Sequence, residues 1–174
     1  IIESGMSALK RAMPFMAEIA GGSLNLDGNS SSDPKVNGEM KAMLSALSQA
    51  ALSASDVSYI NTHGSSSPLG DKTEAEAIGK IFGKRNSNLW LNSTKSLTGH
   101  CLYSAGLVEA IATVEQMREG FLHANKNLEN PICHDLQFCG PESIKHKIDV
   151  AMSNSFGFGG INSAIILKQA RNQR

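Results

Sequence analysis

The sequence predicts one α/β domain in which helices cover both faces of a mixed central sheet, a layered α-β-α arrangement. Short apolar runs alternate with segments of helical periodicity, and two apolar runs, 148–152 and 163–167, close the chain as a strand pair. The 174 residues, 41% hydrophobic and 18% charged, are enough for a single domain with a sizeable core. We therefore treat residues 1–174 as one domain.

The first part of the chain is expected to form two strands joined by a helix. Residues 15–22 are mostly apolar and end in a glycine pair, which indicates a strand. The Gly/Asn/Ser-rich segment 28–34 predicts an exposed loop. Apolar residues then recur at helical spacing and predict a helix over 37–52. The apolar run 57–61 predicts the second strand.

Two further helices are expected on either side of a third strand. The first covers 71–82, with Asp71 as its N-terminal cap, because acidic side chains favour that end of a helix. The apolar run 89–93 predicts the strand. The second helix is expected over 100–119, and the small residues at 104–106 indicate that another backbone passes close to its start.

Charge, hydropathy and cysteine spacing exclude several classes of protein. The formal net charge is zero, and no apolar run approaches the ~20 residues that cross a bilayer, so we expect no nucleic-acid or membrane partner. Three cysteines, Cys101, Cys133 and Cys139, lack the spacing of a disulfide framework or a zinc site. We therefore expect no metal and a cytoplasmic location. The N-terminus lacks both an initiator Met and a basic signal region, so we expect the chain to be part of something larger.

Two histidines carry most of the functional information. His63 and His100 each lie in a short polar, glycine-containing segment that follows an apolar run and leads into a helical pattern. α/β folds place their chemistry at such junctions of strand and helix. A single histidine is more often a satisfied loop residue, but two in matching contexts, one with Lys95 five positions before it, favour a shared active site.

Three ordered signatures resemble the C-terminal half of the β-ketoacyl synthases of fatty-acid and polyketide biosynthesis. They read His-Gly-Ser-Ser-Ser-Pro-Leu-Gly-Asp at 63–71, Ser-Thr-Lys-Ser-Leu-Thr-Gly-His at 93–100 and Asn-Ser-Phe-Gly-Phe-Gly-Gly-Ile-Asn at 154–162. The similarity covers nearly the whole chain. It implies a thiolase-like fold of two pseudo-symmetric α/β halves, of which residues 1–174 are the second, with the N-terminal half absent.

The resemblance also implies catalytic roles. His63 and His100 match the two histidines that help to decarboxylate a malonyl thioester and to stabilise the resulting enolate. A neutral imidazole suits this task because its Nε2–H donates to the developing negative charge without burying a permanent cation. Lys95 matches the lysine that holds the second imidazole and pairs with an acid, and Glu74 matches that acid. A plain surface ion pair between Lys95 and Glu74 is the alternative interpretation.

Three more residues match family positions. Phe158 matches a gating phenylalanine whose backbone N–H is an oxyanion donor, and the glycines around it leave room for such a contact. A glycine-rich hairpin between the last two strands is the alternative. Ser65 and Ser67 match two hydroxyl residues that bind the phosphopantetheine arm. Ile161 replaces a residue that is usually threonine, so one hydroxyl of the family pattern is missing here.

The implied reaction is a decarboxylative Claisen condensation of acyl and malonyl thioesters on acyl carrier protein. It is an acyltransferase reaction that needs no cofactor, because phosphopantetheine carries the substrates. The implied partners are acyl carrier protein, the N-terminal half of the same enzyme and, once the enzyme is complete, a second copy in a homodimer. The attacking cysteine would belong to the absent half and Cys101 is not expected to replace it. The isolated chain is therefore expected to be inactive.

Two alternatives remain for the function. One is a malonyl-carrier-protein decarboxylase of a polyketide cluster, in which the cysteine of the first half is replaced. The other is a non-catalytic partner, such as a chain-length-factor-like domain. The presence of both histidines together with Lys95 weighs against the non-catalytic alternative.

Overall fold

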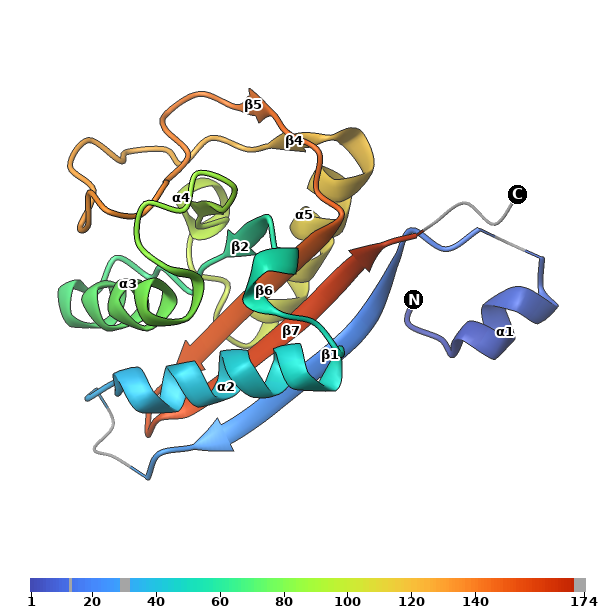
Figure 1. Cartoon of the computed structure of the whole chain (residues 1–174), viewed down its shortest axis with the longest axis horizontal. Helices are drawn as coiled ribbons and strands as arrows, with labels where there is room; N and C mark the ends of the chain where they lie inside the picture. The colour runs from blue at the N-terminus through green and yellow to red at the C-terminus, as the bar shows by residue number, and fades with distance from the viewer. Residues whose placement is uncertain (13, 29–31, 171–174) are drawn as a thin grey trace.

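A five-stranded sheet forms the centre of the molecule (Figure 1). The computed structural model describes residues 1–12, 14–28 and 32–170, so residues 29–31 of the predicted loop lie outside it. The strand order is β1-β7-β6-β2-β3, and β7 runs antiparallel to both of its neighbours while β2 is parallel to β3 and β6. The predicted mixed sheet is thus confirmed. The strands are β1 (Ala17–Leu26), β2 (Tyr59–Asn61), β3 (Trp90–Asn92), β6 (Val150–Gly157) and β7 (Ile161–Gln169).

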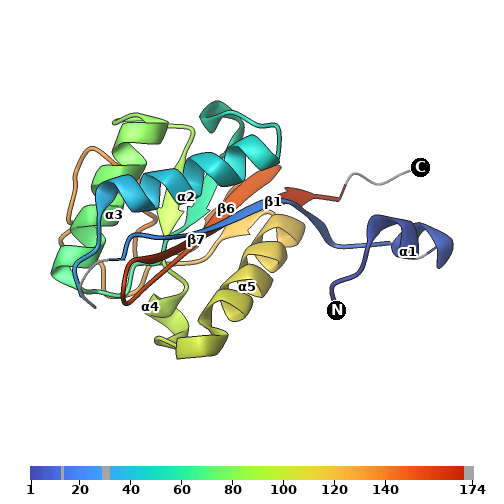
Figure 2. The ribbon, with the colours of Figure 1, turned by 90° about the horizontal axis from the view of Figure 1, so that it is seen from below.

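Helices cover both faces of this sheet, as Figure 2 shows from below: α2 and α3 lie on one side and α5 on the other. This confirms the layered α-β-α arrangement. The long helices are α2 (Val36–Gln49), α3 (Pro68–Phe82) and α5 (Ala105–Glu119). The shorter elements are α1 (Gly5–Lys10), α4 (Lys95–Thr98), the 3₁₀ turns η1 (Ala54–Asp56) and η2 (Leu102–Ser104), and the strands β4 (Phe121–Leu122) and β5 (Ile144–Lys145).

Each helical layer encloses its own apolar core. On the α2 and α3 side, Met43, Ile60 and Ile78 are buried together. On the α5 side, Met117, Leu122 and Ile148 form a second cluster. The close packing of α2 on β1 depends on Gly21, because a Cβ there would lie 2.5 Å from the carbonyl oxygen of Ala46. The central strands are therefore buried on both faces, which explains why they are short apolar runs in the sequence.

Two predicted helix boundaries are wrong. α3 begins at Pro68, three residues before the predicted start, and Ser67 rather than Asp71 is its cap, accepting a hydrogen bond from the Gly70 N–H. The helix predicted from residue 100 begins at Ala105. Gly99, with φ 71°, ends the short helix α4 before it. His100 consequently lies in an irregular link between α4 and η2, and its side chain is exposed.

No helix within the described part of the chain is long and apolar enough to span a membrane. The same residues contain no cluster of His, Cys, Asp and Glu side chains that could hold a metal ion.

Candidate active site

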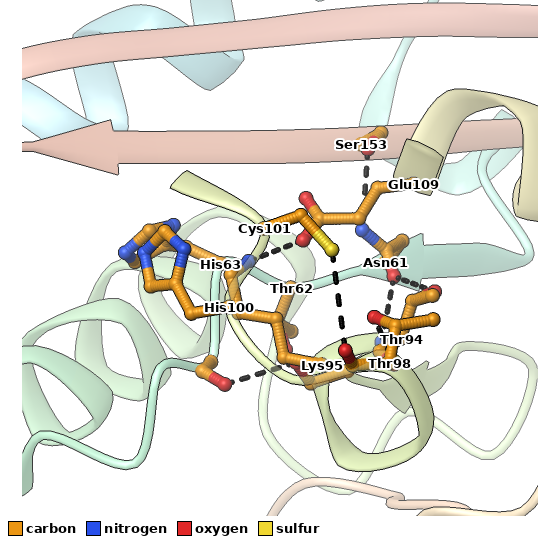
Figure 3. A network of polar contacts seen from close by, with 12 residues as sticks. Asn61, Thr62, His63, Thr94, Lys95, Thr98, His100, Cys101, Glu109 and Ser153 are labelled. Atoms are coloured by element: carbon orange, nitrogen blue, oxygen red, sulfur yellow. Dashed lines mark hydrogen bonds and ion pairs between the residues drawn. The ribbon is translucent and has the colours of Figure 1, made fainter. Parts of the chain in front are cut away.

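The parallel strands β2 and β3 bring the two histidine signatures to one edge of the sheet. Asn61 ends β2 and Asn92 ends β3, so the segments that follow both strands leave the sheet side by side. His63 and His100 meet there with ring centroids 5.5 Å apart and ring planes inclined by 78° (Figure 3). The centroid of the Phe156 ring lies 6.1 Å from that of His63. Two imidazoles separated by 37 positions in the sequence thus share one site.

Glu74 fixes the backbone of the turn that carries His63. Its Oε1 accepts a hydrogen bond from the His63 N–H (2.9 Å), and its Oε2 accepts one from the Gly64 N–H (3.0 Å). Asn154 donates to the same carboxylate from β6 at 3.1 Å. Glu74 is buried, and this burial raises its pKa despite the three donors. Its contribution is therefore to hold the turn, and it does so from the first turns of α3.

Lys95 pairs with Glu109 of α5, and the predicted pairing with Glu74 is wrong. Both side chains of the pair are almost fully buried. Burial raises the pKa of Glu109, while contact with Lys95 opposes that shift. The pairing differs because both oxygens of Glu74 face backbone N–H groups, whereas α5 carries Glu109 beside the start of α4. The surface-pair alternative is excluded too, since this ion pair is internal.

His63 is held in its neutral form. Burial lowers its pKa to about 3, and the positive charge of Lys95 and the proximity of His100 act in the same direction. At neutral pH the ring therefore has one N–H donor and no charge. Such a donor is suited to an oxyanion, because its hydrogen bond becomes stronger as negative charge develops on the oxygen. It also needs no proton exchange with solvent.

We expect the low pKa of His63 to make the protein acid-labile. The unfolded state gains a proton as the pH falls through 6.5, whereas the folded state gains one only near 3. Stability present above pH 6.5 should therefore decline between those two values. In the His63→Gln variant this decline should be shallower, as measured by urea unfolding at a series of pH values. An identical decline in the variant would contradict the assignment of a neutral His63.

The hydrogen bonds of His100 also fix a tautomer. The Leu102 N–H donates to its Nδ1 at 3.1 Å, so neutral His100 carries its proton on Nε2. This leaves Nε2–H as the donor on the free side of the ring.

A cavity of about 650 Å³ adjoins the two signatures. Its lining includes His100, Lys95, Glu74 and Ser65, together with residues of the irregular segment 125–138. His63 and Phe158 are not among the residues that line this cavity.

The remaining predicted residues lie around this region. Phe158 lies in the turn of the β6–β7 hairpin with its side chain exposed. The hydroxyl of Ser67 caps α3. Cys101 is half-buried, and its sulfur lies within hydrogen-bond distance of the carbonyl oxygens of Thr98 and Gly99.

Sequence reasoning missed four buried polar residues at this edge. Asn61 is the last residue of β2, and a polar residue at the end of an apolar run is the signal that marks it. Asn154 lies inside β6 and opens the third signature. Glu109 lies in a helix with no distinguishing motif. His123 follows β4 in irregular chain and has no motif either.

Comparison with known proteins identifies the family. The model of the "Beta-ketoacyl synthase, C-terminal domain" family matches residues 16–129, more than half of the chain. The chain therefore belongs to the β-ketoacyl synthase family, as the C-terminal half of the thiolase-like fold.

Individual relatives agree with this assignment. The chain is 39% identical over 168 residues to the polyketide biosynthesis malonyl-ACP decarboxylase PksF of Bacillus subtilis, covering 97% of the chain and 40% of the relative. It is 42% identical over 168 residues to the chloroplastic 3-oxoacyl-[acyl-carrier-protein] synthase I of Arabidopsis thaliana, covering 95% of the chain and 35% of the relative. The chain thus spans about two fifths of the length of these curated relatives.

A solved structure supports the fold. The ketosynthase complex AntDE:AntF, described as a type II PKS acyl-carrier protein in complex with its ketosynthase, matches with a TM-score of 0.89 and 31% sequence identity. The match covers 97% of the chain and 42% of the matched chain.

Proposed function

We propose that the chain supplies the His/His/Lys half of an active site for decarboxylative Claisen condensation in fatty-acid or polyketide biosynthesis. The observation that carries this proposal is the pair of imidazoles 5.5 Å apart, with His63 neutral and His100 presenting Nε2–H. The substrates are acyl and malonyl thioesters on the phosphopantetheine of acyl carrier protein, and the reaction uses no cofactor or metal. The AntDE:AntF complex supports such a carrier protein as the partner.

In the proposed reaction, the carbon–carbon bond to the malonyl carboxylate breaks and carbon dioxide leaves. The electron pair remains as an enolate, whose oxygen accepts hydrogen bonds from the two histidines. The enolate carbon then attacks an acyl thioester on a cysteine, a new carbon–carbon bond forms, and the cysteine leaves as the thiolate. Ser65 and Ser67 provide hydroxyls for the phosphopantetheine arm, and the Phe158 N–H is the oxyanion donor for the acyl group.

The acyl-accepting cysteine is proposed to come from an N-terminal half that is not among these 174 residues. The exposed apolar face of α5 and η2 supports this, because a surface of this kind marks an interaction site. On that face Tyr103 is fully exposed, and Leu107 and Ile111 are 60% and 55% exposed. The complete enzyme is proposed to be a homodimer in the cytoplasm.

Malonyl decarboxylation without condensation is the second candidate function. The identity of 39% to a malonyl-ACP decarboxylase favours it, and the two histidines serve decarboxylation in either case. The residue that the first half contributes at the acyl-accepting position would distinguish the two. A non-catalytic chain-length-factor-like role fits the buried Lys95 and the neutral His63 less well, because a purely structural domain does not need both residues.

We expect the purified 174-residue chain to form no β-ketoacyl product from acyl and malonyl carrier proteins, since it lacks the acyl acceptor. Carbon dioxide release and product formation should be measured separately, with a full-length β-ketoacyl synthase as the positive control. Condensation by the isolated chain would contradict the proposal, and loss of that activity in Cys101→Ala would then identify Cys101 as the acceptor.

A further inference from the structure

A buried histidine outside the three signatures, His123, packs against the segment that leads to Lys95 and His100. His123 follows β4 and is 7% exposed. Its backbone is fixed on both sides, because its N–H donates to Gln116 Oε1 (2.9 Å) and its carbonyl accepts from Asn92 Nδ2 (2.9 Å). The Nε2 of its ring lies 3.0 Å from Thr94 Oγ1. The ring therefore contacts the residue that directly precedes Lys95.

Thr94 in turn connects the two strand ends. Its backbone N–H and its hydroxyl both lie within hydrogen-bond distance of Asn61 Oδ1, at 3.1 and 2.8 Å (Figure 3). Asn61 also donates to Ser153 of β6 at 3.2 Å. His63 follows Asn61 by two positions and Lys95 follows Thr94 by one. The connection between Asn61 and Thr94 thus sets the position of one catalytic segment relative to the other.

The position of the proton on the His123 ring decides whether the Thr94 hydroxyl donates to Asn61. The Thr94 hydroxyl has a single proton, which it donates either to Asn61 Oδ1 or to His123 Nε2. When His123 carries its proton on Nε2, the hydroxyl accepts from the ring and its own proton goes to Asn61. When the ring proton is on Nδ1, facing the Ala124 carbonyl at 2.9 Å, the hydroxyl turns to the ring and Asn61 keeps only the backbone donor.

We propose that His123 is a positioning residue for the His63 and His100 pair, acting through its Nε2 contact with the Thr94 hydroxyl. The His123 ring contacts the Thr94 hydroxyl, and Thr94 is hydrogen-bonded to Asn61 at the end of β2. These contacts fix the positions of the His63 and His100 segments relative to each other. Burial lowers the pKa of His123 and so favours the neutral ring. The consequence for activity rests on the proposed function, whereas the structural consequence does not.

Two substitutions of His123 distinguish the contribution of Nε2 from that of Nδ1. The side-chain amide of glutamine reaches about as far as Nε2, so His123→Gln keeps the contact with Thr94. The shorter asparagine reaches only the position of Nδ1, so His123→Asn loses that contact. In the 174-residue chain, we expect the imidazole NMR signals of His63 and His100 to shift in His123→Asn and to stay near their original positions in His123→Gln.

A second pair of variants tests the same contact from the other side. Thr94→Val removes the hydroxyl at nearly constant shape and should reproduce the shifts of His123→Asn, whereas Thr94→Ser should resemble the unaltered chain. This pair decides the question if His123→Asn fails to fold. Equal spectra for His123→Asn and His123→Gln, or for Thr94→Val and Thr94→Ser, would overturn the proposal.

In an enzyme containing this chain, His123→Asn should lower kcat for malonyl decarboxylation by about tenfold or more with KM nearly unchanged, because misplaced catalytic groups lose rate rather than binding. His123→Gln should restore most of the rate. If the unaltered enzyme shows no decarboxylation, the proposed function fails, while the NMR comparison still decides whether His123 positions the two histidines. NMR shifts accompanied by unchanged kcat would overturn the catalytic part of the proposal.

Discussion

Replacing His63 or His100 by alanine in an enzyme that contains this chain should lower malonyl decarboxylation by about 10²-fold or more, the usual loss on removing one oxyanion donor. The reason is geometric: the two ring centroids lie 5.5 Å apart, so both rings can contact the oxygen of the proposed enolate. Acyl transfer to the enzyme should fall less, because that step builds its negative charge elsewhere. Release of carbon dioxide from malonyl carrier protein and enzyme acylation are the two measurements.

The control for this pair is His134→Ala, which removes an exposed imidazole from the irregular segment and should leave both rates unchanged. Normal decarboxylation in both His63→Ala and His100→Ala would remove the central claim. A loss in only one of them would assign the enolate contact to that ring alone.

Lys95→Met should destabilise the folded chain by about 3–5 kcal/mol, the usual cost of leaving a buried charge without its partner. Glu109 is then a buried carboxylate with no cation beside it, and its other oxygen, Oε2, already lacks a hydrogen-bond partner. The double variant Lys95→Met/Glu109→Leu should recover most of the loss, because it removes both charges together. Urea unfolding of the single and double variants at pH 7 is the measurement.

The loss in Lys95→Met should also depend on pH. Without Lys95 the pKa of Glu109 rises further, so folding takes up a proton and the penalty grows as the pH rises above the ordinary value of 4.5. The matched control is Lys80→Met, which removes the lysine of an exposed pair with Glu76 and should change stability little. Equal decreases in the free energy of unfolding for Lys95→Met and Lys80→Met would show that the buried pair contributes no more to stability than an exposed pair.

Much of the fold could be predicted because it depends on local patterns. The central strands are buried on both faces, so they stand out as apolar runs, and α2 shows its buried stripe at helical spacing. The boundaries around the site were harder to predict. Ser67 and Asp71 are both good cap residues, and only the path of the chain after His63 selects Ser67. Gly99 ends α4, and the irregular link after it delays the start of α5 to Ala105.

The sequence alone determined the α/β layering and the meeting of His63 and His100, since each histidine follows a short strand and parallel strands end at one edge of a sheet. Only the tertiary structure decided which carboxylate pairs with Lys95. Glu74 is occupied by the backbone of the His63 turn, whereas Glu109 approaches from the helix on the opposite face of the sheet. The strength of a charge pair depends on distance in space and on burial, and sequence separation specifies neither.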